Sequence, residues 1–177
     1  MIEGVKVRYF RNISNHLAYH YQLFLPAGMR WVVKETISEF DIIHLHGHRN
    51  FLNNIVHHYA KKAGKAYILS GHGTILKIER RIFLKRIFDR IFGDRVLRDA
   101  ERFVAVSEYE VKQYTEMDIK LDKIDVIYNG IDSEAYTILP EAGVFKRKYG
   151  LMGKRVILFL GKITPRKGVD FLVRAFA

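Results

Sequence analysis

The sequence predicts an α/β fold in which a parallel sheet carries helices on both of its faces. Short apolar runs of about five residues alternate along the chain with amphipathic stretches of roughly ten or more. Most of these runs end in a glycine or a small polar residue, and the chain has no internal repeat. This alternation is typical of parallel strands that are joined by right-handed crossover helices.

The apolar runs are the expected strands. They cover residues 5–10, 41–47, 66–70, 102–106, 124–128 and 155–160. The first run alternates apolar and polar side chains, which is the period of a strand with one exposed face. The later runs are short and mostly apolar, as expected for strands buried in a parallel sheet.

Helix signals lie between these runs. The expected helices cover residues 27–40, 50–64 and 74–92, a stretch that begins at 107, and a last segment from 168. Pro26 opens the first helix, and Asn50 is a suitable N-cap for the second, which ends at Gly64. Ser107 and Glu110 have the spacing of a capping box, in which Ser107 accepts from the Glu110 amide and Glu110 reaches back.

Length and composition limit the class of protein. The 177 residues suffice for one domain, or for one domain and part of another. Because the chain has no cysteine, disulfides, thiolate metal sites and cysteine nucleophiles are excluded. No apolar run approaches the ~20 residues of a membrane span, and no signal peptide follows Met1, so the expected location is the cytoplasm.

The chain is strongly basic, with a formal net charge of +11 that indicates an anionic partner. Residues 75–102 combine many cations with an apolar helical pattern. This stretch is expected either to pack on the sheet with a charged outer face or to dock on an anionic membrane surface. No DNA-binding or RNA-binding motif accompanies the charge, so nucleic acid is not an expected partner.

Small and polar residues follow the expected strands at their carboxyl ends. Ligands of open parallel sheets bind at this edge. The segments are His44-Leu45-His46-Gly47, Ser70-Gly71-His72-Gly73, Ser107, Asn129-Gly130 and residues 161–168. The alternating His44, His46 and His48 could suggest zinc, but the pattern crosses the strand end and no acidic partner or cysteine accompanies it, so a hydrogen-bonded strand end is the preferred interpretation.

Four of these segments, at compatible spacing, resemble a known family. The motifs are Asp-Ile-Ile-His-Leu-His-Gly at 41–47, Ser-Gly-His-Gly-Thr at 70–74, residues 103–108 with Val-Ile-Tyr-Asn-Gly-Ile-Asp at 126–132, and residues 158–162 with Lys-Gly-Val-Asp at 167–170. They resemble those of retaining glycosyltransferases with two Rossmann-like domains, the GT-B type. This large family includes phosphatidylinositol mannosyltransferases and sucrose synthase-like enzymes.

The resemblance implies an incomplete catalytic unit. Residues 1–150 would form most of an acceptor domain, without the family's first strand and glycine-rich loop. Residues 151–177 would form the first strand, phosphate loop and helix of the nucleotide-sugar domain, without the family's glutamate pair. The chain would belong to an enzyme that transfers a hexose from a nucleoside diphosphate sugar to an acceptor hydroxyl with retention, and alone it would be inactive.

The resemblance also implies roles for individual residues. His72 would face the transferred sugar, and Gly161, Lys162 and Lys167 would bind the donor diphosphate, with Lys162 replacing the family's usual arginine. The acceptor side of the cleft would be formed by His46, Gly47, Gly73, Ser107, Asn129 and Gly130. The implied partners are a nucleotide sugar and a sugar or lipid-linked acceptor, with no metal or other cofactor.

The residues alone leave simpler interpretations open. Lys162 and Lys167 follow a strand and precede a helix, which suits a phosphate, but they could be solvated surface lysines. His72 lies between two glycines, where a ligand can approach closely, but it could be a structural histidine. The alternatives for the chain are a non-catalytic remnant or binding module with the same fold, and a basic membrane-surface protein.

Overall fold

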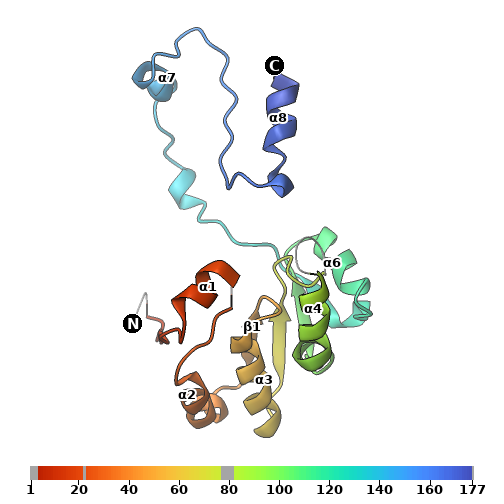
Figure 1. Ribbon diagram of the computed structural model, residues 1–177. Coiled ribbons are helices and arrows are strands. Elements are labelled where there is room, and N and C mark those ends of the chain that lie inside the picture. Colours follow the sequence, from red (N-terminus) through yellow and green to blue (C-terminus); the bar gives the residue numbers. More distant parts are fainter. Residues whose placement is uncertain (1–3, 22, 77–81, 177) are drawn as a thin grey trace. The chain divides into compact units, whose positions relative to one another are not determined.

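A computed structural model describes residues 4–21, 23–76 and 82–176 (Figure 1). The chain divides into two compact units, Met1–Gly130 and Ile131–Ala177. The division falls earlier than the expected boundary at residue 150, because residues 141–154 bond among themselves. The Leu151 N–H donates to the Lys146 carbonyl, and Lys146 Nζ donates to the Lys154 carbonyl. That the units represent an acceptor domain and part of a donor domain stays a prediction.

The first unit contains a four-stranded parallel sheet in the order β1-β2-β3-β4. The strands are β1 (Ile43–His46), β2 (Tyr67–Ser70), β3 (Arg102–Ala105) and β4 (Ile124–Val126). The α/β fold with a parallel sheet is therefore confirmed. Because all four strands run in the same direction, their carboxyl ends meet at one edge of the sheet.

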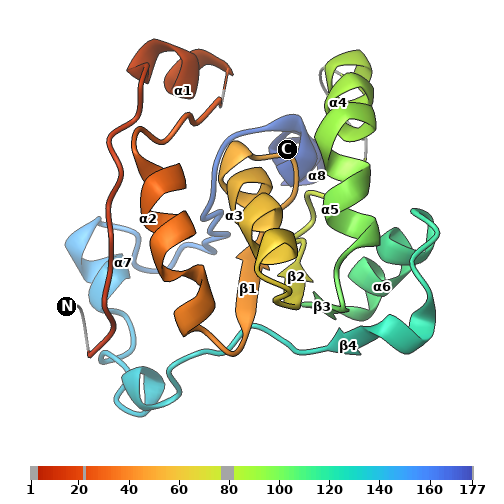
Figure 2. The same ribbon diagram turned by 90° about the horizontal axis from the view of Figure 1, so that it is seen from below.

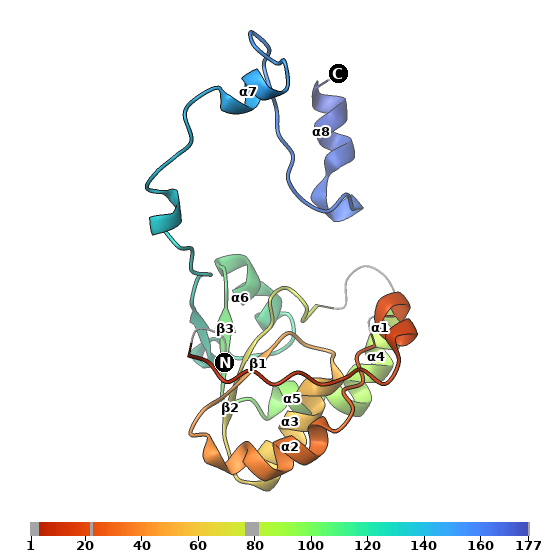
Figure 3. The ribbon, with the colours of Figure 1, turned by 90° about the vertical axis from the view of Figure 1, so that its left-hand side faces the viewer.

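Helices accompany this sheet in the first unit. They are α1 (Asn15–Tyr21), α2 (Met29–Thr36), α3 (Phe51–Lys62), α4 (Ile82–Phe88), α5 (Asp94–Arg98) and α6 (Glu108–Thr115). A π-helical turn, Asp89–Gly93, makes α4 and α5 continuous, and 3-10 turns follow α2 and precede β4. Figures 2 and 3 show α2 beside α3, with α5 next to α3.

The core lies between the sheet and these helices. Its largest fully buried side chains belong to Tyr67, Leu69, Ile75, Phe103 and Tyr114. They come from the two central strands, from the loop after β2 and from α6. The apolar side chains of the two central strands are therefore buried, as their sequence predicts, together with side chains from the loop after β2 and from α6.

The caps explain where two helices begin. Asn50 Oδ1 accepts from the Asn53 N–H at 2.7 Å, so the predicted N-cap of α3 is confirmed. Ser107 Oγ accepts from the Glu110 N–H at 3.2 Å at the start of α6. The reciprocal half of the predicted capping box is wrong, because the Glu110 carboxylate bonds to the backbone N–H groups of Gly73 and Val106 instead.

Three expected elements differ from the structure. Residues 5–10 form no strand, because their alternating side chains find no neighbouring strand to pair with in the described part of the chain. Residues 74–76 form a turn held by Arg49 rather than a helix. The following helix is described from Ile82, and residues 77–81 of the expected helix lie outside the described residues.

The second unit consists of short helices joined by extended chain. They are a 3-10 turn at Glu134–Tyr136, α7 (Val144–Lys148), a 3-10 turn at Pro165–Lys167 and α8 (Val169–Phe176). The expected strand at 155–160 is wrong, because this extended segment has no ladder partner among the described residues. The expected helix after Gly168 is confirmed as α8.

Candidate functional site

The loops after β1 and β2 form one hydrogen-bonded edge. Gly47 turns the chain with a φ of +71°, and its N–H donates to the Ser70 carbonyl at 2.7 Å. The His48 N–H then donates to Thr74 Oγ1 at 2.7 Å, and that hydroxyl donates to the Gly71 carbonyl at 2.6 Å. The two loops therefore hold each other in place at the carboxyl edge of the sheet.

Three histidine side chains gather on this edge. His46 Nδ1 lies 2.9 Å from His72 Nε2, and their rings are stacked at 5.2 Å between centroids. The His44 ring lies 4.1 Å from that of His46, and His44 Nε2 bonds to Ser70 Oγ at 2.7 Å. The predicted site residues His46 and His72 are thus in direct contact.

The protonation of this cluster follows from its geometry. The bond between His46 and His72 needs one ring nitrogen as donor and the other as acceptor, so these facing nitrogens do not both carry protons. Burial lowers the pKa of His44, and the neighbouring His46 and His72 rings lower it further. His72 has a φ of 50°, a left-handed conformation that the flanking glycines help the chain to reach. The rings of His46 and His72 are both exposed, and each can present a nitrogen to a polar ligand.

A buried ion pair between Arg49 and Asp89 holds the loops at the carboxyl edge of the sheet in place. The Arg49 guanidinium donates to both carboxylate oxygens of Asp89, with Nη2 at 2.8 Å from Oδ2. It also donates to the backbone carbonyls of Thr74, Ile75 and Leu76. Arg49 therefore joins the loops after β1 and β2 to the π-helical turn.

A buried histidine, His48, lies beside this ion pair and affects its electrostatics. The side chain of Asp89 is 1% exposed, and His48 Nε2 lies 3.4 Å from its Oδ1. Burial alone raises the pKa of Asp89, but the contacts with His48 and Arg49 outweigh it and hold the pKa below its ordinary value. Burial lowers the pKa of His48, and the Asp89 carboxylate opposes that effect. Asp89 therefore remains the charged partner of Arg49.

Two side chains of α6 complete the edge. Glu110 is 3% exposed, and its carboxylate accepts from the N–H groups of Gly73 at 2.6 Å and Val106 at 2.8 Å. The Tyr114 hydroxyl accepts from the Gly71 N–H at 2.7 Å and donates to the Val104 carbonyl at 2.9 Å. Burial raises the pKa of Tyr114, so its hydroxyl stays protonated and can donate. The loop that carries His72 is thus held from both sides.

Sequence reasoning missed these supporting residues. Arg49, Asp89 and Tyr114 have no motif, and Glu110 was assigned only to a helix cap. One signal was available for Asp89, which is an acidic residue between the apolar pairs Ile87-Phe88 and Ile91-Phe92. A buried acid in such a setting needs a cationic partner.

The remaining predicted site residues of the first unit do not join the histidine contact among the described residues. Ser107 caps α6. Asn129 and Gly130 follow β4, are exposed, and make no hydrogen bond to the histidine loops within the described residues. Lys162 and Lys167 belong to the second unit and are exposed near the start of α8.

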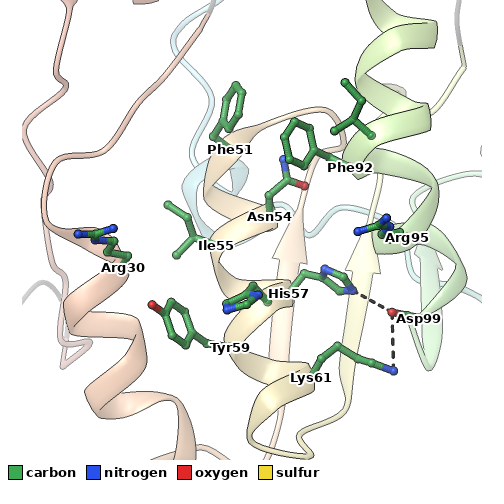
Figure 4. A pocket seen from close by; sticks show the side chains of 12 residues that line it. Arg30, Phe51, Asn54, Ile55, His57, Tyr59, Lys61, Phe92, Arg95 and Asp99 are labelled. Atoms are coloured by element: carbon green, nitrogen blue, oxygen red, sulfur yellow. Dashed lines mark hydrogen bonds and ion pairs between the residues drawn. The ribbon is translucent and has the colours of Figure 1, made fainter.

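A separate pocket of about 610 Å³ lies among the helices (Figure 4). Arg30 of α2 lines it together with residues of α3 and of the segment from Ile91 to Asp99. His57 Nε2 lies 2.9 Å from Asp99 Oδ2. The hydrogen bond between them lowers the pKa of Asp99, and the nearby charge of Lys61 lowers it further. The pocket contains none of the three strand-end histidines. Over the residues that the structure describes, no group of three or more His, Asp or Glu side chains is arranged to hold a metal ion.

Comparison with known proteins identifies the family of this chain. Residues 2–135 match the model of Glycosyltransferase Family 4. YtcC of Bacillus subtilis is 28% identical over 145 residues, covering 78% of this chain, and MJ1178 of Methanocaldococcus jannaschii is 27% identical over 173 residues, covering 94% of it. Both are named as glycosyltransferases, the first provisionally and the second as an uncharacterized one.

A solved structure shares the fold. Anabaena HepE in complex with UDP and glucose is 18% identical, with a TM-score of 0.68 over 94% of this chain and 43% of its own. The chain spans 33% of YtcC and 44% of MJ1178, which is less than half the length of either relative. Since the family model matches most of its residues, this chain belongs to Glycosyltransferase Family 4.

Proposed function

We propose that this chain is part of an enzyme that transfers a hexose from a nucleoside diphosphate sugar to an acceptor hydroxyl with retention. The observation that carries the proposal is the contact between His46 and His72 at the carboxyl edge of a sheet of this family. Ligands bind at that edge in open parallel sheets. The complexes of HepE with UDP-glucose and with UDP and glucose support a nucleotide sugar as donor.

The histidine pair suits recognition of a sugar hydroxyl. His72 is exposed and its backbone is held through Gly73 by Glu110, so its ring has a defined position. One imidazole nitrogen can donate to a hydroxyl or accept from it, depending on the tautomer that the bond to His46 selects. In this proposal His72 contacts the transferred sugar, and His46, Gly47 and Gly73 form the adjoining wall. Ser107, Asn129 and Gly130 complete the acceptor side.

The donor diphosphate is assigned to residues 161–168. Lys162 and Lys167 are exposed cations just before α8, whose first amides point toward its N-terminus. Gly168, with a φ of +63°, turns the chain into that helix. Two lysines and free amides would stabilise the charge that develops on the leaving diphosphate, so the proposed reaction uses no metal.

The proposal includes where the enzyme works and what this chain can do alone. We place the reaction in the cytoplasm, with a sugar or lipid-linked acceptor at the inner face of the membrane. Transfer also needs pockets for the base, ribose and sugar, for which this chain supplies only residues 161–168. Positioning and electrostatics carry such a reaction, so we expect no turnover by the 177-residue chain.

Two measurements test this function. Calorimetric titration with a panel of nucleotide sugars should identify the donor in a longer protein that joins this chain to the rest of a donor domain. Product analysis in that protein should give transfer with retention, whereas binding without transfer would identify a binding module. Turnover by the purified 177-residue chain would contradict the assignment of the donor site.

A further inference from the structure

Four apolar side chains of the continuous helical segment 82–98 point outward and form an apolar stripe. Phe83 is 72% exposed, Leu84 56%, Ile87 41% and Ile91 49%. The opposite face packs inward through Asp89, Gly93, Val96 and Leu97. A surface helix of a globular protein normally has the reverse arrangement, with its apolar face toward the core. An exposed apolar stripe of this kind marks an interaction site.

The buried ion pair fixes this orientation. Asp89 points inward because Arg49 binds its carboxylate, with His48 beside it. Gly93 lies so close that a Cβ there would stand 2.6 Å from Asp89 Oδ1 and 3.0 Å from His48 Nε2. Rotation of the helix would take the Asp89 carboxylate away from the Arg49 guanidinium, so this face of the helix stays inward and the apolar stripe stays outside.

Cations flank the stripe. Arg86, Arg90, Arg95 and Arg98 are exposed, whereas Asp94 is the single exposed acid between residues 82 and 98. Asp89, the other acid of this segment, is paired inside. Arg86 and Arg90 lie four residues apart, as do Phe83, Ile87 and Ile91, so cationic and apolar side chains run along the helix together. This combination suits binding to a partner that has an apolar interior and an anionic outer layer.

The pocket of Figure 4 adjoins the stripe at Ile91, and Phe92 and Arg95 of the same helical segment also line it. Arg30 of α2 adds another cation to the pocket lining, whereas Lys61 is paired there with Asp99, whose Oδ2 lies 3.7 Å from its Nζ. Asn54 also lines the pocket, and its Nδ2 is buried without a hydrogen-bond partner in the described part of the chain. These donors suit the phosphate group of a headgroup that lies beside the helix.

We propose that helical segment 82–98 docks on an anionic lipid bilayer, with the apolar stripe at the acyl boundary and headgroup phosphates on the flanking arginines and in the adjoining pocket. The segment is roughly 25 Å long at 1.5 Å per residue and would lie along the surface. Within the described residues no helix is long and apolar enough to cross a membrane. Docking of this kind does not require glycosyl transfer, so vesicle binding by this chain tests it separately from the proposed function.

Vesicle sedimentation tests the proposal with the full chain. We expect binding to phosphatidylcholine vesicles that contain phosphatidylglycerol, little binding to pure phosphatidylcholine, and release at high salt. Arg86→Gln with Arg90→Gln should weaken binding about 25-fold, from roughly fivefold for each lost cation. Phe83→Ser with Ile87→Ser should also weaken it while leaving the charge unchanged, and circular dichroism should show that both pairs of variants remain folded.

The matched control removes the same charge elsewhere. Lys112→Gln with Lys120→Gln changes two exposed lysines on and after α6 and should weaken vesicle binding less than fivefold. Loss as large as that of the arginine pair would overturn the proposal in favour of general charge attraction. Equal binding to neutral vesicles would also overturn it. So would self-association through Phe83 and Ile87 without vesicle binding, because a second copy would then cover the stripe.

Discussion

Replacement of Arg49 by methionine removes the charge that balances the buried Asp89. The Asp89 carboxylate would lose the bidentate bond to the guanidinium, while its own side chain is 1% exposed and His48 Nε2 lies 3.4 Å from Oδ1. Breaking a buried pair by removing one partner costs about 3–5 kcal/mol. The three backbone carbonyls of residues 74–76 also lose a donor, and among them the carbonyl of Ile75 belongs to a fully buried residue, so its loss adds to the destabilisation. We therefore expect the free energy of unfolding of Arg49→Met to fall by about 3–5 kcal/mol.

The pH dependence of the stability distinguishes the effect of the lost charge from the effect of altered packing. Because the pKa of Asp89 in the folded state lies below its ordinary value of 3.8, the stability that the charged carboxylate contributes is present above that value and lost as the pH falls. In Arg49→Met, burial dominates and the carboxylate takes up a proton at higher pH than in the original chain. The difference in stability between the two proteins should therefore shrink as the pH falls from 7 toward 4.

Urea unfolding followed by circular dichroism measures both effects. The double variant Arg49→Met with Asp89→Leu should be more stable than Arg49→Met alone, because no unpaired charge remains inside. A loss below about 1 kcal/mol for Arg49→Met, or a difference that does not change with pH, would refute the role assigned to this pair.

Three further predictions concern the loops and the donor site. Gly71→Ala should lower the free energy of unfolding by about 1–3 kcal/mol, because the new Cβ would stand 2.5 Å from Cγ1 of the buried Ile75; unchanged thermal unfolding would contradict this contact. Glu110→Gln should weaken the bond to the Gly73 N–H and speed amide exchange there, and equal exchange in both proteins would show that the carboxylate does not hold the loop. In a longer, active protein that carries this chain, Lys167→Ala should weaken donor use by about 1–3 kcal/mol, whereas unchanged nucleotide-sugar kinetics would remove Lys167 from the donor site.

The sheet and the histidine edge could be predicted because their signals are local. The apolar runs that contain Leu45, Leu69 and Phe103 have strand length, and the residues that follow them are those that a carboxyl edge requires. The N-caps at Asn50 and Ser107 were predictable for the same reason, since each bond joins residues three positions apart.

The rest depends on contacts between distant residues. Arg49 and Asp89 are 40 positions apart, and Glu110 and Gly73 are 37 positions apart, so no local pattern pairs them. The strand signal at 155–160 was misleading because a strand also needs a neighbour, which period and propensity do not supply. The outward stripe on segment 82–98 has the same origin, because the distant partner of Asp89 decides which side of the helix faces inward.

The most direct test of the account is sugar transfer by a longer protein that carries this chain and the rest of a donor domain, compared with its His72→Ala variant. We expect the longer protein to consume a nucleotide sugar. The His72→Ala variant should lower kcat/KM at least about tenfold, because it loses one hydrogen bond that contributes roughly 1.4 kcal/mol in the transition state. His16→Ala, at an exposed histidine of α1, is the control and should leave transfer unchanged. Equal transfer by the His72→Ala variant and the unaltered protein would contradict the placement of the sugar at this edge.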